Sequence, residues 1–431
     1  MLKKIKYLSL GIIIVSLCAL NVQAQNKTGS PYTRYGLGDL QNKNFGDSRA
    51  MGNTSLAMRG GNKLYVANPA SYTSIDSLRF IMEVGVGGSF KYMSSGTTGE
   101  TASLYDMNLD YLSFGFPVTS YWGAAMGVMP YSDVGYDLVT SESSLGYPRK
   151  HYYAGSGGVN QAFLGSSFSL LDNLSLGVNF NYLFGSISQI NTVEFDGEID
   201  GMVDIREENT MYINDYYFSL GAQYTHNFSE EQALTLGITW DVNNTLNAKR
   251  DYIVSNSLSS ATDVVVDTIA YESKEKGKIS LPSGIGAGLA YTYKDVLTLA
   301  ADYKFQDWTD NEIFGEVDSL GASQRVSMGA EYIPDGKSSA SLSYAGKIRY
   351  RLGAYYHDSY LQFDQGNTRV NDFGISFGLG LPMKRSNTTF NLSLELGQRG
   401  SLKNNLVKEQ YVLVGMNFSL ADIWFIKRKF E

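Results

Sequence analysis

The sequence predicts an all-β fold, a 14-stranded antiparallel transmembrane β-barrel with an N-terminal plug, or hatch, in its lumen. Three observations lead to this prediction. Apolar and polar residues alternate in fourteen separate segments, which is the pattern of strands with one apolar and one polar face. The connections between these segments alternate between long and short. An irregular stretch that carries glycines and arginines precedes the first segment.

The first 24 residues have the features of a secretory signal peptide. A basic start (KKIK, 3–6) is followed by an apolar run over 7–20 and by the small-residue cleavage site VQA (22–24). The apolar run of about 14 residues is shorter than the roughly 20 that a transmembrane helix needs. We therefore expect Sec-dependent export and removal of residues 1–24. The single cysteine, Cys18, lies in this leader, so disulfide and thiol chemistry are not expected in the exported chain.

Residues 25–76 are predicted to form the plug. The stretch GGNKLYVANPASYTSIDSL (60–78) has neither a period of 2 nor one of 3.6 and contains an Asn-Pro turn signal. Glycines allow this segment to turn tightly, and its basic residues could meet carboxylates of the barrel wall. The Asn-Pro pair would supply the turn that leads out of the plug. The plug residues singled out in this way are Arg34, Arg49, Arg59, Asn68 and Pro69.

The barrel is predicted over residues 77–420. In LSLGVNFNYLF (174–184), for example, large apolar residues alternate with serine, glycine and asparagine. Residues 421–431 are expected either to extend the last strand or to form a short cap. The fourteen predicted strands are 77–92, 104–116, 122–138, 158–170, 174–190, 210–226, 233–247, 281–293, 296–306, 322–333, 339–356, 370–383, 388–399 and 409–420.

The connections indicate a membrane barrel. Long ones follow the odd-numbered strands, as in 139–157, 191–209 and 248–280, and short ones such as 171–173 follow the even-numbered strands. Outer-membrane barrels have this asymmetry, with short turns on the periplasmic side and long loops outside. In lipid a sheet must also close, because an open edge leaves backbone groups unpaired. We therefore expect the protein in the outer membrane of a Gram-negative bacterium.

Charged residues on the inward faces of the strands allow two interpretations. A barrel of fourteen strands has a lumen that wall side chains alone do not fill, so it holds water, a plug or both. The charges could pair with the plug, or they could line a substrate path and hold an anionic head group. The inward positions are Asp302, Lys304, Glu331, Lys347, Arg349, Arg351 and Glu395.

The third predicted strand contains a proline in its middle, Pro130. Proline cannot donate to a strand ladder and is confined to edges and bulges. Pro130 therefore predicts a bulge or kink where strand pairing is lost locally. The gap could be a lateral window to the membrane or a tolerated irregularity near the rim.

The composition gives no support for an enzyme or for a metal or cofactor site. The three histidines, His151, His226 and His357, are far apart and show no ligand spacing, and the common hydrolase, metalloprotease and P-loop patterns do not occur. The acidic run over 193–209 lacks the spacing of a calcium loop and is interpreted as a solvated loop. Removal of the three leader lysines changes the net charge from −8 to −11, so we expect no nucleic-acid partner.

Several short motifs make the chain similar to the FadL family of outer-membrane channels for long-chain fatty acids and other hydrophobic compounds. They are ANPAS (67–71) at the end of the plug segment and Pro130-Tyr131-Ser132 in the third strand. The stretches SPYTRYGLGDL (30–40) and MGNTSLAMRGG (51–61) resemble a branch of the family in Bacteroidota-type bacteria. The resemblance implies that the N-terminal segment is a hatch inside the barrel. It also implies that the strand-three kink, at Pro130, Tyr131 and Ser132, opens sideways into the bilayer.

Two functions follow as hypotheses. The first is passive uptake of a hydrophobic small molecule, similar to a long-chain fatty acid, through the lumen and a lateral opening, with membrane lipid as the neighbour. The alternative is a non-transporting accessory subunit of an outer-membrane secretion or assembly machine, because some FadL-like barrels bind other subunits. In that case the long connection 248–280, with VVVDTIAY (264–271) as an extra strand, could be a docking surface.

Overall fold

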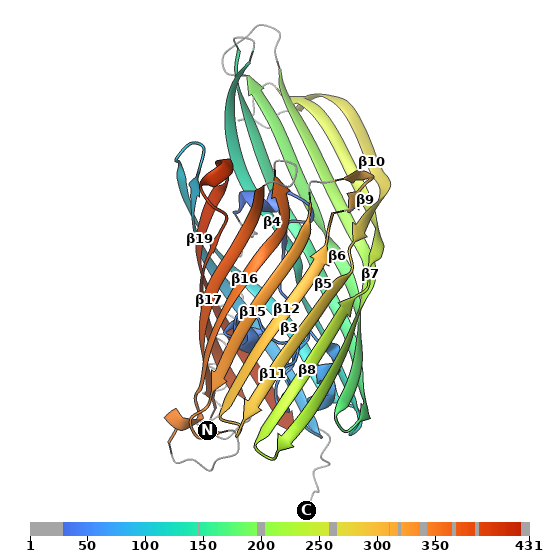
Figure 1. Ribbon diagram of the computed structural model, residues 1–431. Helices are drawn as coiled ribbons and strands as arrows, with labels where there is room; N and C mark the ends of the chain where they lie inside the picture. Colours follow the sequence, from blue (N-terminus) through green and yellow to red (C-terminus); the bar gives the residue numbers. More distant parts are fainter. Residues whose placement is uncertain are drawn as a thin grey trace, which may run out of the picture.

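The computed structural model describes residues 29–144, 147–195, 203–257, 265–309, 311–317, 320–336, 343–363, 368–383 and 388–423. In this part of the chain, fourteen antiparallel strands form a closed barrel around the N-terminal segment (Figure 1). The prediction of the fold class is confirmed. The predicted signal peptide (1–24) and residues 424–431 of the predicted tail lie outside the described residues.

The barrel strands follow one another around the wall in chain order, and β19 pairs with β2 along its whole length to close the barrel. Residues 421–423 continue β19. The strands are β2 (Arg79–Ser95), β3 (Thr101–Pro117), β4 (Trp122–Ser144), β5 (Tyr147–Leu171), β6 (Leu174–Phe195), β7 (Asp204–Ser229), β8 (Gln232–Asp241), β11 (Gly284–Tyr293), β12 (Leu297–Asp307), β15 (Ala322–Tyr332), β16 (Arg349–Phe363), β17 (Thr368–Pro382), β18 (Thr389–Arg399) and β19 (Val407–Ile423).

The wall is taller on one side than on the other. Strands β4 to β7 rise above the rest at the upper end of Figure 1 and are joined there by the hairpin of β9 (Asn244–Ser257) and β10 (Val265–Leu281). β9 pairs with the upper half of β7, whereas β8 pairs with its lower half and also with β11. The small hairpin of β13 (Glu312–Ile313) and β14 (Glu316–Val317) packs beside β10.

The outer face of the barrel is apolar. Large hydrophobic side chains point away from the lumen along successive strands, such as Phe180 on β6, Ile238 and Trp240 on β8, and Leu352 on β16. Such a belt suits contact with lipid tails, and strands suit a membrane because their backbone groups are paired between neighbours. Among the described residues, no helix is long and apolar enough to span a membrane.

The N-terminal segment forms a compact plug inside the barrel. It contains the 3-10 helix η1 (Pro31–Arg34), the short strand β1 (Asp39–Leu40), the helix α2 (Gly46–Arg49) and the 3-10 helix η2 (Pro69–Ser74). Wall glycines allow it to approach closely: a Cβ at Gly237 would lie 2.1 Å from the Leu56 carbonyl oxygen, and one at Gly353 would lie 2.0 Å from the Gly52 nitrogen. These glycines let plug and wall backbones touch.

The structure differs from the sequence-based strand boundaries in several places. The predicted strand 233–247 is two strands, β8 and β9, and β10 takes most of the predicted long connection 248–280. The predicted connection 139–157 consists mainly of the upper parts of β4 and β5, because a strand above the lipid belt can be polar on both faces. The predicted strand 339–356 is wrong over residues 343–348, and its residues 339–342 lie outside the described residues. The chain there forms the 3-10 helix η3 (Ala345–Lys347), and β16 begins at Arg349. A further 3-10 helix, η5 (Lys403–Asn405), precedes β19.

Candidate functional site

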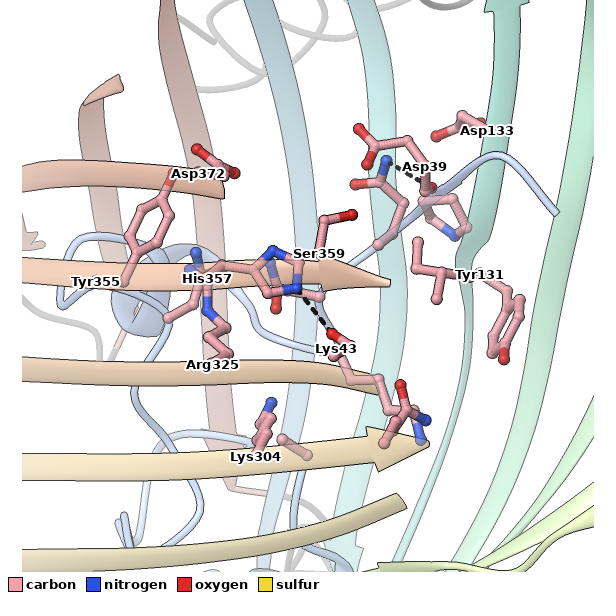
Figure 2. Close-up of a pocket in the computed structure, with 18 of the residues that line it drawn as sticks. Asp39, Lys43, Tyr131, Asp133, Lys304, Arg325, Tyr355, His357, Ser359 and Asp372 are labelled. Carbon is pink, nitrogen blue, oxygen red and sulfur yellow. Dashed lines mark hydrogen bonds between the residues drawn. The ribbon is translucent and has the colours of Figure 1, made fainter. Parts of the chain in front are cut away.

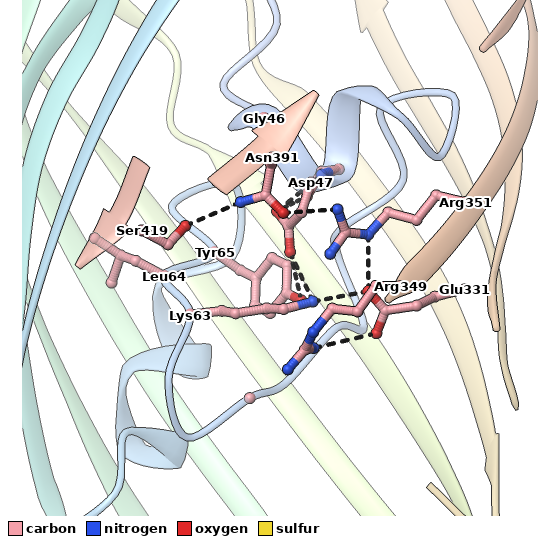
Figure 3. A network of polar contacts seen from close by, with 12 residues as sticks. Gly46, Asp47, Lys63, Leu64, Tyr65, Glu331, Arg349, Arg351, Asn391 and Ser419 are labelled. Atoms are coloured by element: carbon pink, nitrogen blue, oxygen red, sulfur yellow. Dashed lines mark hydrogen bonds and ion pairs between the residues drawn. The ribbon is translucent and has the colours of Figure 1, made fainter. Parts of the chain in front are cut away.

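A buried network of charges ties the plug to one side of the barrel wall (Figure 3). We call it the latch, and it consists of Asp47, Lys63, Glu331, Arg349 and Arg351. The plug residue Lys63 lies 3.0 Å from both the Asp47 and the Glu331 carboxylates. On the wall, Arg351 Nε lies 2.8 Å from Glu331 Oε2, and Arg349 lies 3.6 Å from Glu331 Oε1. Three cations thus surround two carboxylates, and one of the two comes from the plug.

The local fold explains this arrangement. Glu331 on β15 and Arg351 on β16 are direct cross-strand partners, and opposite charges in such positions attract. The Asp47 carboxylate also accepts a hydrogen bond from Tyr65 Oη (3.1 Å). Burial alone would raise the pKa of Asp47, but Lys63 and Arg351 hold this pKa below its ordinary value. Asp47 therefore stays charged at neutral pH and binds Lys63.

The other plug residues predicted from the sequence also contact the wall. Arg49 forms an ion pair with Asp110 of β3 (2.7 Å), and the Arg34 guanidinium lies 3.9 Å from the ring centre of Tyr153. Asn68 is fully buried and donates to the Leu56 carbonyl (2.7 Å), and Pro69 begins η2. The pair Asn68-Pro69 thus starts a helix deep in the plug, and β2 begins ten residues later, at Arg79.

Arg59 differs from the other plug arginines, because its hydrogen-bond partners are neutral. Its guanidinium donates to Gln223 (3.0 Å), Ser175 (3.3 Å) and Thr73 (2.9 Å). Burial lowers the pKa of Arg59 to about 10, which leaves it charged at neutral pH. Arg59 is therefore held by dipoles on β6, β7 and η2.

The predicted lumen charges fall into two groups. Glu331, Arg349 and Arg351 belong to the latch. Asp302 Oδ2 accepts hydrogen bonds from the plug amides of Ser55 (2.6 Å) and Leu56 (2.9 Å), so it also holds the plug. Glu395 accepts from Tyr355 Oη (2.7 Å), and Lys304 lines the lumen cavity described below. The placement of Lys347 is wrong: it lies exposed in η3 because the strand starts only at Arg349.

The wall has a seam between β3 and β4. The two strands pair only at their lower ends, from Leu112 opposite Val128 to Pro117 opposite Gly123. Among the described residues, no ladder joins β3 to β4 above this point. We use the name seam for the two facing strand edges, Thr101–Tyr111 of β3 and Met129–Ser144 of β4. A bulge in β3 lies where the pairing ends, because Gly85 of β2 is opposite Tyr111 while the next residue is opposite Leu109.

Pro130, Tyr131 and Ser132 lie at the point where β4 leaves β3. β4 continues to pair with β5, with a register shift between Pro130 and Ser132. The free edge of β4 is covered from inside by the plug: β1 pairs with Ser132 and Asp133, and the Gln41 amide donates to the Tyr131 carbonyl (2.9 Å). The plug thus replaces β3 as the partner of β4 at this level.

The free edge of β3 has a different environment. Tyr105, Met107 and Leu109 are the most exposed large hydrophobic side chains of this strand, with 80%, 73% and 62% of their surface accessible. The backbone amide of Met107 is satisfied locally by the Asp106 carboxylate (2.8 Å). An edge of this kind with apolar side chains is a ready site for lipid, a hydrophobic molecule or another chain.

A cavity of about 330 Å³ lies in the lumen between the plug and the upper wall and reaches the seam (Figure 2). Asp106, Asn108 and Asp110 of β3 and Pro130 of β4 line its seam side. The cavity, which we call the chamber, is strongly charged. Its charged lining residues are Lys43, Arg49, Lys91, Lys304, Arg325 and Arg399 with Asp39, Asp106, Asp110, Asp133, Asp241, Asp372, Glu395 and Glu409.

Sequence reasoning missed several residues of this region. Arg325 and His357 on β15 and β16 carry the same inward alternation as the predicted charges, so the pattern could have identified them. Asp110 could not be identified, because the bulge shifts the alternation of β3. No group of three or more His, Cys, Asp or Glu side chains in the described ranges is arranged to hold a metal.

The comparisons with known proteins agree with this geometry. The model of one family, BamG, matches residues 1–431. The structure is similar to the toluene transporter TbuX of Ralstonia pickettii (13% identity, TM-score 0.56, 88% of this chain and 99% of that chain). It is also similar to a FadL homologue of Pseudomonas aeruginosa (12%, 0.55, 89% and 98%) and to the P. putida toluene transporter TodX (14%, 0.54, 90% and 100%). At such low identity these likenesses show a shared FadL-like fold. A search of curated proteins finds no match.

Proposed function

The chain belongs to the BamG family, and on this premise we propose that it is a non-transporting accessory subunit of the β-barrel assembly machinery in the bacterial outer membrane. The observation that carries the proposal, beyond the family itself, is the latch. Transport through the lumen to the lower end of the barrel would require the plug to move, and movement would separate Lys63 from Glu331, whose side chain is 2% exposed. Breaking a buried ion pair costs about 3–5 kcal/mol.

The chemistry of the lumen supports the same proposal. Sites for hydrophobic ligands are usually lined mainly by apolar and aromatic side chains. The chamber combines fourteen charged residues, among them Arg325 and Glu409, with apolar and aromatic ones such as Leu56 and Phe305. An apolar solute would therefore have to displace water from charged groups.

The hairpin of β9 and β10 is the proposed contact with other subunits. It stands above the wall and carries the exposed apolar residues Ile269 and Tyr271. Exposed apolar side chains beyond the lipid belt are typical of protein contacts. This assigns the docking role to the region 248–280.

The test is purification of the tagged protein from native outer membranes in a mild detergent. We expect the other subunits of the assembly machinery to be recovered with it, and fewer of them with the double variant Ile269→Ser, Tyr271→Ser. A matched control replaces Leu170 and Leu171, which are equally exposed at a lower turn (58% and 61%), with serine. Recovery of a monomer alone from wild-type membranes would rule out the accessory role.

The seam favours a second candidate function, passive uptake of a hydrophobic small molecule that leaves the lumen sideways. In liposomes that contain the purified protein, a fluorescent fatty acid should enter faster than in protein-free liposomes. Asn108→Trp, which would fill the seam side of the chamber, should abolish this gain. Leu164→Trp on the outer face of β5 is the control. Uptake equal to that of protein-free liposomes would exclude the transport role.

A further inference from the structure

Three nitrogen-bearing side chains stand side by side on the chamber wall (Figure 2). Lys304 on β12 is opposite Arg325 on β15, and Arg325 is opposite His357 on β16. All three line the chamber. Side chains in directly opposite positions lie about 5 Å apart at their Cβ atoms, and two like charges so placed repel each other. The row therefore places two cations, Lys304 and Arg325, in neighbouring positions, where an acidic residue beside either of them would have given an attractive pair.

Arg325 interacts electrostatically with Asp302, Asp372 and Glu395, but none of these three carboxylates lies at ion-pair distance from it. The residue is only 8% exposed. Its Nη2 donates to the Gly52 carbonyl at 3.5 Å, and its guanidinium carbon lies 3.9 Å from the ring centre of Tyr355. The Nε atom is buried and has no hydrogen-bond partner. Among the described residues, neither Arg325 nor Lys304 forms an ion pair with a carboxylate. A buried cation without a partner is costly.

The other cations of the lumen show what is missing. Lys43 pairs with Asp241 (2.8 Å), Arg49 with Asp110 (2.7 Å) and Arg399 with Asp39 (3.1 Å). Several chamber carboxylates are thus already committed. Three more are held by hydroxyl donors: Glu395 by Tyr355, Asp372 by Tyr411 and Glu409 by Ser30.

We propose that the row Lys304–Arg325–His357 is a binding site for an oxyanion, a phosphate or carboxylate group. Arg325 would present its guanidinium group to the anion and Lys304 its ammonium group. His357 is positioned by Ser323, whose Oγ lies 3.1 Å from Nε2, so its second ring nitrogen can serve the ligand. The cavity of about 330 Å³ has room for such a group with water, since each water occupies about 30 Å³.

Two sources can supply this chemistry. A free phosphate could enter the lumen from solution, or the head group of an anionic lipid could enter through the seam, which the chamber reaches at Asp106 and Asp110. An oxyanion site is compatible with the accessory role and with the uptake role proposed above. Its binding test therefore does not depend on which of the two roles is correct.

The test uses the full-length barrel in detergent, with inorganic phosphate as the probe in calorimetry. We expect measurable binding that Arg325→Gln and Lys304→Gln each weaken at least tenfold. Lys294→Gln is the control, because Lys294 is an exposed lysine at the turn between β11 and β12, paired with Glu231 (3.3 Å). If Arg325→Gln fails to fold, Lys304→Gln carries the same expectation.

Thermal unfolding gives a second readout that a merely structural arginine would not produce. In phosphate-free buffer, Arg325→Gln should unfold at the same temperature as wild type or higher, because it removes a buried charge that forms no direct ion pair. Added phosphate should raise the unfolding temperature of wild type and not that of the variant.

The lipid source is tested in nanodiscs that contain phosphatidylglycerol, by mass spectrometry of the lipid retained after extraction. Loss of that lipid in Arg325→Gln, with no phosphate binding to wild type, would assign the site to a head group. If wild type binds neither phosphate nor the lipid, or if Arg325→Gln and Lys304→Gln both bind as wild type does, the proposal is wrong.

Discussion

The plug is held on two sides of the barrel by different kinds of contact. On the side of β15 and β16 it is bound through the latch, where Lys63 and Asp47 meet Glu331 and Arg351. On the side of the seam it is bound through its backbone, where β1 and Gln41 pair with the edge of β4. The first contact depends on charge. The second combines backbone pairing with the ion pairs Asp39–Arg399 and Arg49–Asp110.

This difference shows how the plug can fill the lumen while the strands β3 and β4 stay unpaired at the seam. The latch wall is paired around Glu331 and Arg351, with β15 joined to β16 in continuous register and β16 joined to β17 with one register shift, between Asp358 and Gln362. The seam wall lacks its upper ladder, and the plug serves as a substitute strand for β4 only. The two sides should therefore respond differently to charge removal, acid and backbone strain.

The largest effect is expected at Glu331. In Glu331→Gln, the cations Lys63, Arg349 and Arg351 lose their shared buried carboxylate, so the free energy of unfolding should fall by about 3–5 kcal/mol. Denaturant titration of the detergent-solubilised barrel measures this. Glu231→Gln at an exposed turn should cost only about 0–1 kcal/mol. Equal stability of the two variants would show that the latch does not hold the plug.

Acid should act more strongly on the latch than on the seam side, where the Asp39–Arg399 ion pair is accompanied by backbone hydrogen bonds. The pKa of Asp47 is below its ordinary value of 3.8, so its stabilising contribution is complete above that value and is lost as the pH falls through the lower pKa of the folded protein. The loss should be smaller than that of Glu331→Gln, because Lys63 keeps Glu331 as a partner.

Hydrogen exchange, corrected for the intrinsic effect of pH, measures this difference. Amides around Asp47 and Lys63 should lose protection below about pH 3.8. Those of residues 39–41 should lose less, because their backbone hydrogen bonds to β4 do not titrate even though the Asp39–Arg399 pair does. Equal loss at both places would mean that the plug leaves the wall as one unit.

A smaller effect is expected from strain on the seam side. Gly38 precedes β1 with φ of +89°, and a Cβ there would lie 2.5 Å from the Asp133 carbonyl oxygen. Gly38→Ala should destabilise the plug–β4 contact by about 1–3 kcal/mol and raise hydrogen exchange at residues 39–41. Gly99→Ala is the matched control, because Gly99 has φ of +72° and no atom within 4 Å of its Cβ position. Similar exchange at 39–41 in both variants would contradict the role of β1.

Much of this fold was predictable from alternation, and the places where prediction failed have physical causes. Within the lipid belt one face of each strand is apolar, so strands such as β6 (Leu174–Phe195) and β18 (Thr389–Arg399) begin close to their predicted starts. Above the belt both faces can be polar, and the upper parts of β4 and β5 looked like a loop. The serine-rich run before Arg349 alternates in the same way as a strand, which is why Lys347 was misplaced.

The site was less predictable, because it depends on contacts between distant segments. Alternation identified Glu331, Arg349 and Arg351 as inward, but it could not show that Lys63 reaches Glu331, 268 residues away. Pro130 marked the position in β4 where pairing changes. It did not reveal that β3 loses its partner at a bulge or that the plug covers the edge of β4.

The smallest effect is expected from Pro130→Ala. The bulge between Pro130 and Ser132 is fixed by β5 on one side and by Gln41 and β1 on the other, so the substitution removes a constraint on the unfolded chain and no native contact. Stability should fall by only about 0.4–1 kcal/mol, as it should in Pro117→Ala at the paired end of β3. Amides of residues 101–111 should exchange as in wild type. If they become protected in Pro130→Ala alone, the proline itself keeps β3 and β4 apart, and the plug only fills a gap that the proline has made.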